Sequence, residues 1–216
     1  MMHLLWRSFL RFAFHLFYNS FAFTYDFVSA LVSRGRWRAW TRAAIPFIVG
    51  KRVFEIPCGT GNLLLDLSAT GYAPIGADLS GSMLTITRGK LRESNRHVPL
   101  VRARAQMLPF CSNAFDSIVM TFPPGFVHDP HAFAELRRVL DDEGRLIWVD
   151  AARLLPHDVV SRLLNRALDV VDGSTAPFTT MARELLARAG FEAHIELVQD
   201  DASLVSVVTA TPEPSN

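Results

Sequence analysis

Short apolar runs alternate with stretches of helical spacing through the middle of the chain. The apolar runs predict five strands, at residues 52–56, 73–77, 99–103, 115–121 and 145–151. Apolar positions three and four apart predict helices between them, near residues 61–69, 81–93 and 131–140. Alternating strands and helices are typical of a mostly parallel sheet that is covered on both faces. The pattern therefore predicts a doubly wound α/β domain.

The last quarter of the chain changes this pattern. Two helices and two β segments are predicted there, at residues 156–171, 179–189, 191–198 and 204–210. Gly190 ends the second helix, and a polar turn at residues 199–202 separates the β segments. The sheet should therefore have seven strands and end in a hairpin, and residues 211–216 are expected to form a disordered tail.

The first 50 residues form a different kind of segment, which we interpret as a helical extension that acts as a substrate lid. Residues 3–23 are rich in large apolar groups: Trp6, Phe9, Phe12, Phe14, Phe17, Phe21 and Phe23. One polar stripe recurs every four residues: His3, Arg7, Arg11 and His15. Such a helix either lies on a membrane or closes over an apolar substrate pocket. The alternative is a helix that packs on the domain with its basic stripe in water.

Charge is divided unevenly between this extension and the rest of the chain. Residues 1–52 contain eight Lys or Arg against one acid, a net charge of +7. The remaining residues contain 14 Lys or Arg and 20 acids, a net charge of −6. The total of +1 conceals this asymmetry.

Composition indicates one domain with a sizeable core, residues 51–210. Of the 216 residues, 50% are hydrophobic and 20% are charged. Cys58 and Cys111 have neither metal-ligand spacing nor a disulfide pattern, so we expect no metal site and a cytoplasmic protein, at most peripheral to the inner face of the membrane. No run of eighteen apolar residues occurs, and no nucleic-acid partner is predicted.

The chemistry is concentrated in the turn after the first predicted strand. Gly59 and Gly61 permit close approach of a ligand, and Asp78 follows the next strand, where it can accept hydrogen bonds from ribose hydroxyls. A dinucleotide fingerprint would require a third glycine at Leu64, and no Gly-Lys-Ser/Thr triplet of a P-loop follows. Glu55 would repel phosphates and attract a cation. S-adenosylmethionine carries two suitable cations, an ammonium and a sulfonium.

Five segments in order resemble the motifs of class I S-adenosylmethionine-dependent methyltransferases. They are EIPCGTG (55–61), GADLSGSML (76–84), ARAQMLPF (103–110), FDSIVM (115–120) and ELRRVL followed by GRL (135–146). The resemblance implies a Rossmann-like fold, with one strand of the terminal hairpin inserted antiparallel. It implies S-adenosylmethionine as cofactor, bound through Glu55, Cys58, Gly59, Gly61, Asp78, Leu79, Met83, Ala105, Gln106 and Thr121.

Some of these positions have other interpretations or depart from the family pattern. Met83 lies at helical spacing with core positions, so it is either an adenine contact or core filler. Pro57 replaces the first glycine of the loop and has no N–H. Arg104 replaces the acid that would hold the adenine amino group, and an arginine cannot accept a hydrogen bond.

The segments FAFTYD (21–26) and SRGRWRAW (33–40) resemble the entry region of ubiquinone/menaquinone C-methyltransferases. By that resemblance Tyr25 would lie over the methionine end of the cofactor and the substrate would be membrane-borne. The residues FPPGF (122–126) replace the family's F-G-I-R-N, so a lipophilic acceptor is favoured over a quinone ring in particular. His128 is a candidate general base, with a loop histidine beside the helix cap Asp129 as the alternative.

Together these patterns predict an enzyme that transfers a methyl group from S-adenosylmethionine to a small, lipophilic acceptor. Catalytic candidates are His128 and Tyr25. The alternative is a non-catalytic relative, such as a membrane-associated accessory protein.

Overall fold

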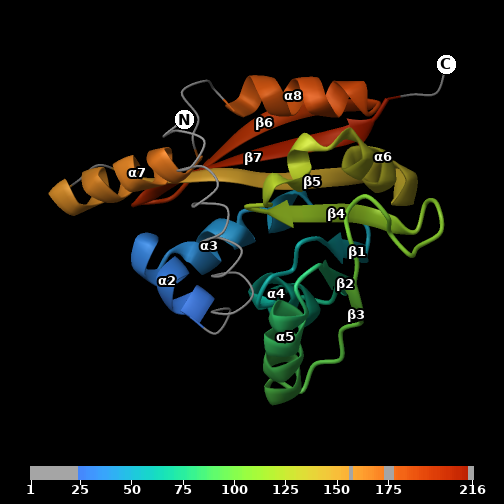
Figure 1. Ribbon diagram of the computed structural model, residues 1–216, viewed down its shortest axis with the longest axis horizontal. Coiled ribbons are helices and arrows are strands. Elements are labelled where there is room, and N and C mark those ends of the chain that lie inside the picture. Colours follow the sequence, from blue (N-terminus) through green and yellow to red (C-terminus); the bar gives the residue numbers. More distant parts are fainter. Residues whose placement is uncertain (1–23, 156–157, 173–177, 214–216) are drawn as a thin grey trace, which may run out of the picture.

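The computed structural model describes residues 24–155, 158–172 and 178–213 (Figure 1). The aromatic segment 3–23 and its polar stripe lie outside the described residues. The terminal residues 214–216 lie outside them as well.

A seven-stranded sheet forms the centre of the molecule. Its strands are β1 (Arg52–Glu55), β2 (Ala73–Asp78), β3 (Leu100–Arg102), β4 (Phe115–Thr121), β5 (Leu140–Leu154), β6 (Phe191–Gln199) and β7 (Ser203–Pro212). The strand order is β3-β2-β1-β4-β5-β7-β6. Strands β1 to β5 pair in parallel, and β7 is antiparallel to both β5 and β6. The predicted mostly parallel sheet with an inserted antiparallel strand is confirmed.

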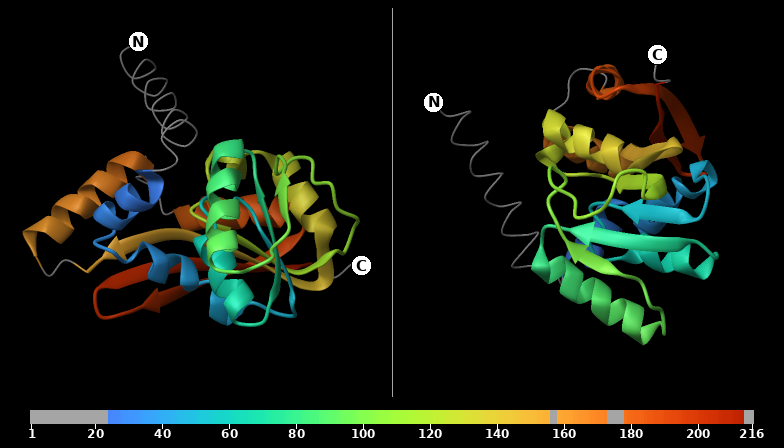
Figure 2. Two further views of the ribbon diagram at one scale, coloured as in Figure 1. Left: turned by 90° about the horizontal axis from the view of Figure 1, so that it is seen from below. Right: turned by 90° about the vertical axis from the view of Figure 1, so that its right-hand side faces the viewer.

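Helices lie on both faces of the sheet (Figures 1 and 2). They are α2 (Tyr25–Val32), α3 (Trp37–Arg42), α4 (Asn62–Ala69), α5 (Gly81–Glu93), α6 (Pro130–Val139), α7 (Val159–Asp172) and α8 (Phe178–Arg188), with short 3-10 turns η2 (Ile45–Phe47) and η3 (Gly125–His128). Successive residues of β4 point to opposite faces: Ile118 and Met120 join the core beneath α6 and α8, and Val119 joins the core beneath α3 and α4. Burial on both faces explains the nearly continuous apolar sequence of this strand.

Two element boundaries differ from the sequence-based expectations. Strand β5 begins at Leu140, directly after α6, and continues to Leu154, well beyond the predicted 145–151. It is extended because β4 and β7 pair with it along its two edges, and β7 reaches as far as Leu154. The disordered tail predicted at residues 211–216 is wrong for Thr211 and Pro212, which belong to β7.

The extension is joined to the body by packing. Trp40, Ala43 and Ala44 are buried in the same core as Val53 and Leu67, so residues 37–48 complete one face of the sheet. A buried Trp or Phe side chain removes about 150–250 Å² of surface from water, which makes Trp40 a major contributor to this contact.

The arginines of the extension pair with acids of the body. Arg34 contacts Asp158 at 2.5 Å, Arg36 contacts Asp200 at 2.8 Å, and Arg38 contacts Asp66 at 2.6 Å. In the described part of the extension, these basic residues therefore form ion pairs with acids of the same chain. Because these pairs are exposed on at least one side, each contributes only modestly to stability.

Candidate functional site

The glycine turn predicted from the sequence joins β1 to α4 at the carboxyl edge of the sheet. Gly59 and Gly61 have φ values of +51° and +78°, a region in which glycine is favoured. At Gly61 a Cβ would lie 2.4 Å from Cγ2 of Thr87, while at Gly59 it would meet nothing described within 4 Å. The turn is therefore packed tightly beneath Gly61 and open above Gly59, as a loop that admits a ligand requires.

Asp78 at the end of β2 holds two backbone segments together. Its Oδ2 accepts a hydrogen bond from the N–H of Gly59 at 3.0 Å, and its Oδ1 accepts one from the N–H of Ser80 at 2.8 Å. The side chain is 1% exposed. Both carboxylate oxygens therefore hold backbone N–H groups of the turn and of the segment that leads into α5.

Glu55 is a buried acid at the end of β1. Its side chain is 2% exposed, and its Oε2 lacks a hydrogen-bond partner among the described residues. Burial, followed by the nearby charges of Asp78 and Asp66, raises the pKa of Glu55 well above its usual range. A cationic group beside Oε2 would reverse that shift, so the residue fits a ligand with an ammonium or sulfonium. The lack of a partner for this oxygen among the described residues is the main observation in favour of the predicted cofactor.

Cys58 follows in the same turn, and its N–H donates to the carbonyl oxygen of Ala77 at 2.8 Å. Burial and then the charges of Glu55 and Asp78 raise the pKa of the Cys58 thiol. The side chain therefore acts as a buried apolar group in this turn and not as a thiolate.

The segment predicted to border the adenine lies after β3. Ala105 is buried, and the side-chain amide of Gln106 donates to Oδ2 of Asp129 at 3.0 Å. Asp129 also caps α6, because its Oδ1 accepts from the N–H of His131 at 3.0 Å. The structure thus brings the adenine segment against the loop after β4, and it places Gln106 in a structural contact that the sequence did not indicate.

Two further predicted cofactor residues differ in exposure. Met83 is fully buried in α5, as its core assignment requires, and a contact with adenine remains a prediction. Leu79 is 55% exposed directly after Asp78. Its position at the rim suits an apolar contact with a bound ring.

Tyr25 belongs to an aromatic cluster that covers the end of β4. Its ring meets Trp37 edge to face at 6.1 Å, and Trp37 lies 4.6 Å from the ring of Phe122. Phe122 follows Thr121 with a φ of +46°, an uncommon conformation for a bulky residue. Burial, then the charges of Asp26 and Asp78, raises the pKa of Tyr25 to about 12. The tyrosine is therefore protonated near neutrality.

His128 lies in η3, after β4, and is exposed. Thr121 ends β4 beside Val149 of β5, at the edge where the other predicted contacts gather. A catalytic role for His128 remains a prediction.

Asp26 is a site residue that the sequence analysis missed. Its Oδ1 accepts hydrogen bonds from Oγ1 of Thr60 at 2.6 Å and from Nδ2 of Asn62 at 3.0 Å. Lys90 of α5 forms an ion pair with Asp26 and donates to Oδ1 of Asn62 at 2.8 Å. We call these four residues the Asp26 cluster. The signal available in the sequence was that Asp26 is the one acid in an otherwise basic segment.

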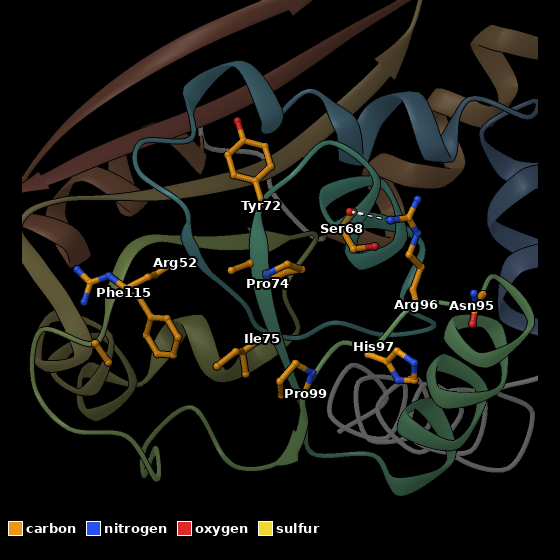
Figure 3. A pocket seen from close by; sticks show the side chains of 12 residues that line it. Arg52, Ser68, Tyr72, Pro74, Ile75, Asn95, Arg96, His97, Pro99 and Phe115 are labelled. Carbon is orange, nitrogen blue, oxygen red and sulfur yellow. Dashed lines mark hydrogen bonds between the residues drawn. The ribbon is translucent and has the colours of Figure 1, made fainter.

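A hollow of about 570 Å³ lies at the amino ends of the strands, opposite the glycine turn (Figure 3). Arg52, Ala73 and Phe115, at the starts of β1, β2 and β4, line it. Figure 3 shows Arg96 hydrogen-bonded to the backbone oxygen of Ser68 at its rim. Because ligands of open α/β sheets bind at the carboxyl ends of the strands, this hollow is distinct from the predicted cofactor site.

The strand order, the inserted antiparallel β7 and the glycine turn between β1 and α4 define an α/β fold of the methyltransferase type. A solved structure described as a SAM-dependent methyltransferase, possible histamine N-methyltransferase, from Thermotoga maritima has a TM-score of 0.65 to this chain at 23% identity. The match covers 91% of this chain and 98% of that one, which shows a shared fold.

Sequence comparison identifies the domain more closely. Residues 53–144 match a family described as "Methyltransferase domain". The chain is 33% identical over 146 residues to a demethylmenaquinone methyltransferase of Symbiobacterium thermophilum, and 33% identical over 170 residues to the ubiquinone/menaquinone biosynthesis C-methyltransferase UbiE of Pseudomonas aeruginosa. These matches cover 63% and 74% of this chain.

The matches span 58% and 64% of the length of those two relatives. Fold, motifs and matches agree, and the chain contains a methyltransferase domain of the S-adenosylmethionine-dependent class.

Proposed function

We propose that this protein transfers a methyl group from S-adenosylmethionine to a small, lipophilic acceptor. The observation that supports this most directly is the buried Oε2 of Glu55, which has no hydrogen-bond partner among the described residues. Glu55 ends the strand that leads into the open turn at Gly59. A carboxyl in that position fits a cationic cofactor and disfavours a phosphate-bearing one.

Different residues would bind different parts of the cofactor. Glu55 would attract the cationic amino-acid end, Asp78 would accept from the ribose hydroxyls, and the open backbone at Gly59 would lie against the chain between them. Ala105, Leu79 and Thr121 would border the base and the reacting end. When bound, S-adenosylmethionine supplies a methyl group on a positively charged sulfur.

The protein's main contribution to the reaction is alignment. An in-line displacement is accelerated chiefly by holding the two reactants at the correct distance and angle. The cluster of Tyr25, Trp37 and Phe122 supplies rigid apolar walls next to the end of β4. Tyr25 can donate a hydrogen bond because it stays protonated near neutrality. His128 would accept a proton where the acceptor must lose one.

A lipophilic acceptor is supported by two observations. The matched relatives are named as methyltransferases of menaquinone and ubiquinone biosynthesis. In this chain, Phe27 and Leu31 of α2 are 71% and 63% exposed, and they lie one helical turn apart on the element that also carries Tyr25. Helix α2 thus presents an exposed apolar side in the described part of the extension.

We also propose that residues 3–23 contact a membrane surface. No helix among the described residues is long and apolar enough to cross a bilayer. Flotation with liposomes should recover the full chain with the lipid and leave a form that lacks residues 1–23 in the soluble fraction. Equal recovery of both forms in the soluble fraction would refute membrane contact.

A second candidate function is a protein that binds the cofactor without transferring its methyl group. Pro57 and Arg104, which replace a glycine and an acid of the family motifs, favour it. The two candidates separate in one assay: lipid extract and S-adenosylmethionine labelled in the methyl group are incubated with the protein. Labelled lipid indicates transfer. Cofactor binding without labelled product in extracts, with a known quinone methyltransferase as a positive control, would contradict the enzyme proposal.

A further inference from the structure

We propose that Asp26 is a positioning residue that couples the docking of α2 to binding at the glycine turn. This inference rests on the proposed cofactor site and adds a second element to it. The Asp26 cluster joins three parts of the chain that are distant in sequence: α2, the turn with the start of α4, and α5.

The cluster holds both sides of Gly61. Thr60 precedes this glycine and Asn62 follows it, and both donate side-chain hydrogen bonds to the same oxygen of Asp26. A turn with two positive φ values is flexible in isolation, since glycine loses more conformational freedom on ordering than other residues. The paired contacts to Asp26 restrict that freedom where the cofactor would lie.

Helix α5 reinforces the same turn from below. Thr87 donates to the carbonyl oxygen of Gly59 at 2.8 Å, and one turn further along the helix Lys90 donates to Asn62. Lys90 also carries the charge that Asp26 pairs with. The turn is thus held between α5 on one side and α2 on the other, and α2 is attached through Asp26.

Asp26 also fixes the residue next to it. Tyr25 precedes Asp26 in the first turn of α2, and its ring packs edge to face on Trp37. When Asp26 is bound to the turn, the first turn of α2, which includes Tyr25, is attached to it. When Asp26 is released, α2 loses its attachment to the turn, and Tyr25 is no longer held in place through its neighbour.

The strength of the cluster suits a reversible contact. The side chains of Asp26 and Lys90 are 40% and 24% exposed, so water can compete for them. Several charge-assisted bonds converge on one carboxylate, which makes the cluster stronger than an isolated surface ion pair. Burial raises the pKa of Asp26, but hydrogen bonds from Lys90 and Thr60 outweigh it and hold the pKa below its usual value.

Coupling of this kind acts in both directions. If a docked α2 favours the conformation of the turn that binds the cofactor, bound cofactor must favour the docked α2 by the same factor. If the contact were purely structural, its removal would lower the stability of the protein without producing this reciprocal effect.

The test uses the full chain and S-adenosylhomocysteine as probe, so that no acceptor is needed. Asp26→Asn and Lys90→Met remove the charge pair, and Lys90→Arg keeps it. Arg36→Gln is the matched control, because it breaks the similarly exposed Arg36–Asp200 pair of the same extension without touching the turn. Calorimetry gives the dissociation constant, and hydrogen exchange of the amides of α2 is measured with and without the probe.

We expect the probe to slow exchange in α2 of the wild type. Asp26→Asn and Lys90→Met should raise the dissociation constant about tenfold, speed exchange in α2 without the probe, and abolish the slowing. Lys90→Arg and Arg36→Gln should retain wild-type affinity and slowing.

The outcomes separate the two proposals. A wild type that does not bind the probe overturns the proposed cofactor site. A wild type that binds, with Asp26→Asn and Lys90→Met unchanged in affinity and in exchange of α2, overturns the coupling alone. Should Asp26→Asn fail to fold by circular dichroism, the comparison of Lys90→Met with Lys90→Arg decides the question.

Discussion

Binding of the cofactor should release a proton from Glu55. In the free protein, burial and the charges of Asp78 and Asp66 raise the pKa of Glu55 well above 4.5. Between that ordinary value and the raised one, the carboxyl is protonated in the folded protein. A cationic ligand beside Oε2 favours the ionised form, so the proton leaves as the ligand binds.

The magnitude follows from the chemistry of a single carboxyl. The wild type should release up to about one proton per ligand, and Glu55→Gln should release none from this position. A hydrogen bond to a charged group contributes about 1.5 to 3 kcal/mol, which corresponds to an affinity loss of about 10- to 150-fold in Glu55→Gln.

The assay is calorimetric titration with S-adenosylmethionine in buffers of different ionisation enthalpy. The observed enthalpy of the wild type should vary with the buffer, and that of Glu55→Gln should not. Glu192→Gln, which changes an exposed acid of β6, should behave as the wild type does. A buffer-independent enthalpy together with wild-type affinity in Glu55→Gln would refute the assignment of Glu55.

The same residue makes the stability of the free protein depend on pH. A carboxyl with a raised folded pKa binds its proton more tightly in the folded state, so its contribution to stability falls as pH rises from about 4.5 toward the folded pKa. Glu55→Gln should lack this decline in urea unfolding measured across the same range. An identical decline in the variant would assign the effect to another group.

Four further substitutions test the account of the fold. Gly61→Ala should lower the free energy of unfolding in urea by about 2 to 5 kcal/mol, because φ is +78° and the new Cβ would lie 2.4 Å from Thr87. Gly71→Ala has a similar φ of +87° but no described atom within 4 Å of the new Cβ, so it should lower that free energy by about 1 to 2 kcal/mol. Equal costs would contradict the packing argument. Phe122→Ala should lower stability by about 2 kcal/mol through loss of contact with Trp37 and Trp40, and an unchanged unfolding midpoint would exclude a structural role for the cluster. Asp116 has a lowered pKa, because hydrogen bonds from Arg52 outweigh its partial burial, so its stabilisation is complete above about pH 3.8 and is lost as pH falls through the folded pKa. The stability difference between wild type and Asp116→Asn should therefore shrink in acid, and a constant difference would refute it.

Much of the fold could be predicted because the local patterns are strong. Alternating apolar runs and helical spacing predicted all seven strands. Gly59 and Gly61, expected to permit close approach of a ligand, both have positive φ angles, which the sequence analysis did not predict. The insertion of one antiparallel strand followed from the resemblance of the motifs, since sequence periodicity alone does not specify neighbours in a sheet.

The parts that could not be predicted depend on contacts between distant segments. Asp26 and Lys90 are 64 residues apart, and neither carries a local signal for the other. The length of β5 is set by the strands beside it, and the pairing of Arg36 with Asp200 is set by where the last hairpin lies. Phe122 in a left-handed conformation is equally a product of tertiary packing, because propensity alone disfavours it.

The central claim is that the edge formed by Glu55, Gly59 and Asp78 binds S-adenosylmethionine. The most direct measurement is calorimetric titration of the purified full chain with S-adenosylmethionine and S-adenosylhomocysteine, beside Asp78→Ala. The account predicts binding of both compounds at one site per chain, with most of the affinity lost in Asp78→Ala. No binding of either compound at millimolar concentration, or equal affinity in Asp78→Ala, would contradict it.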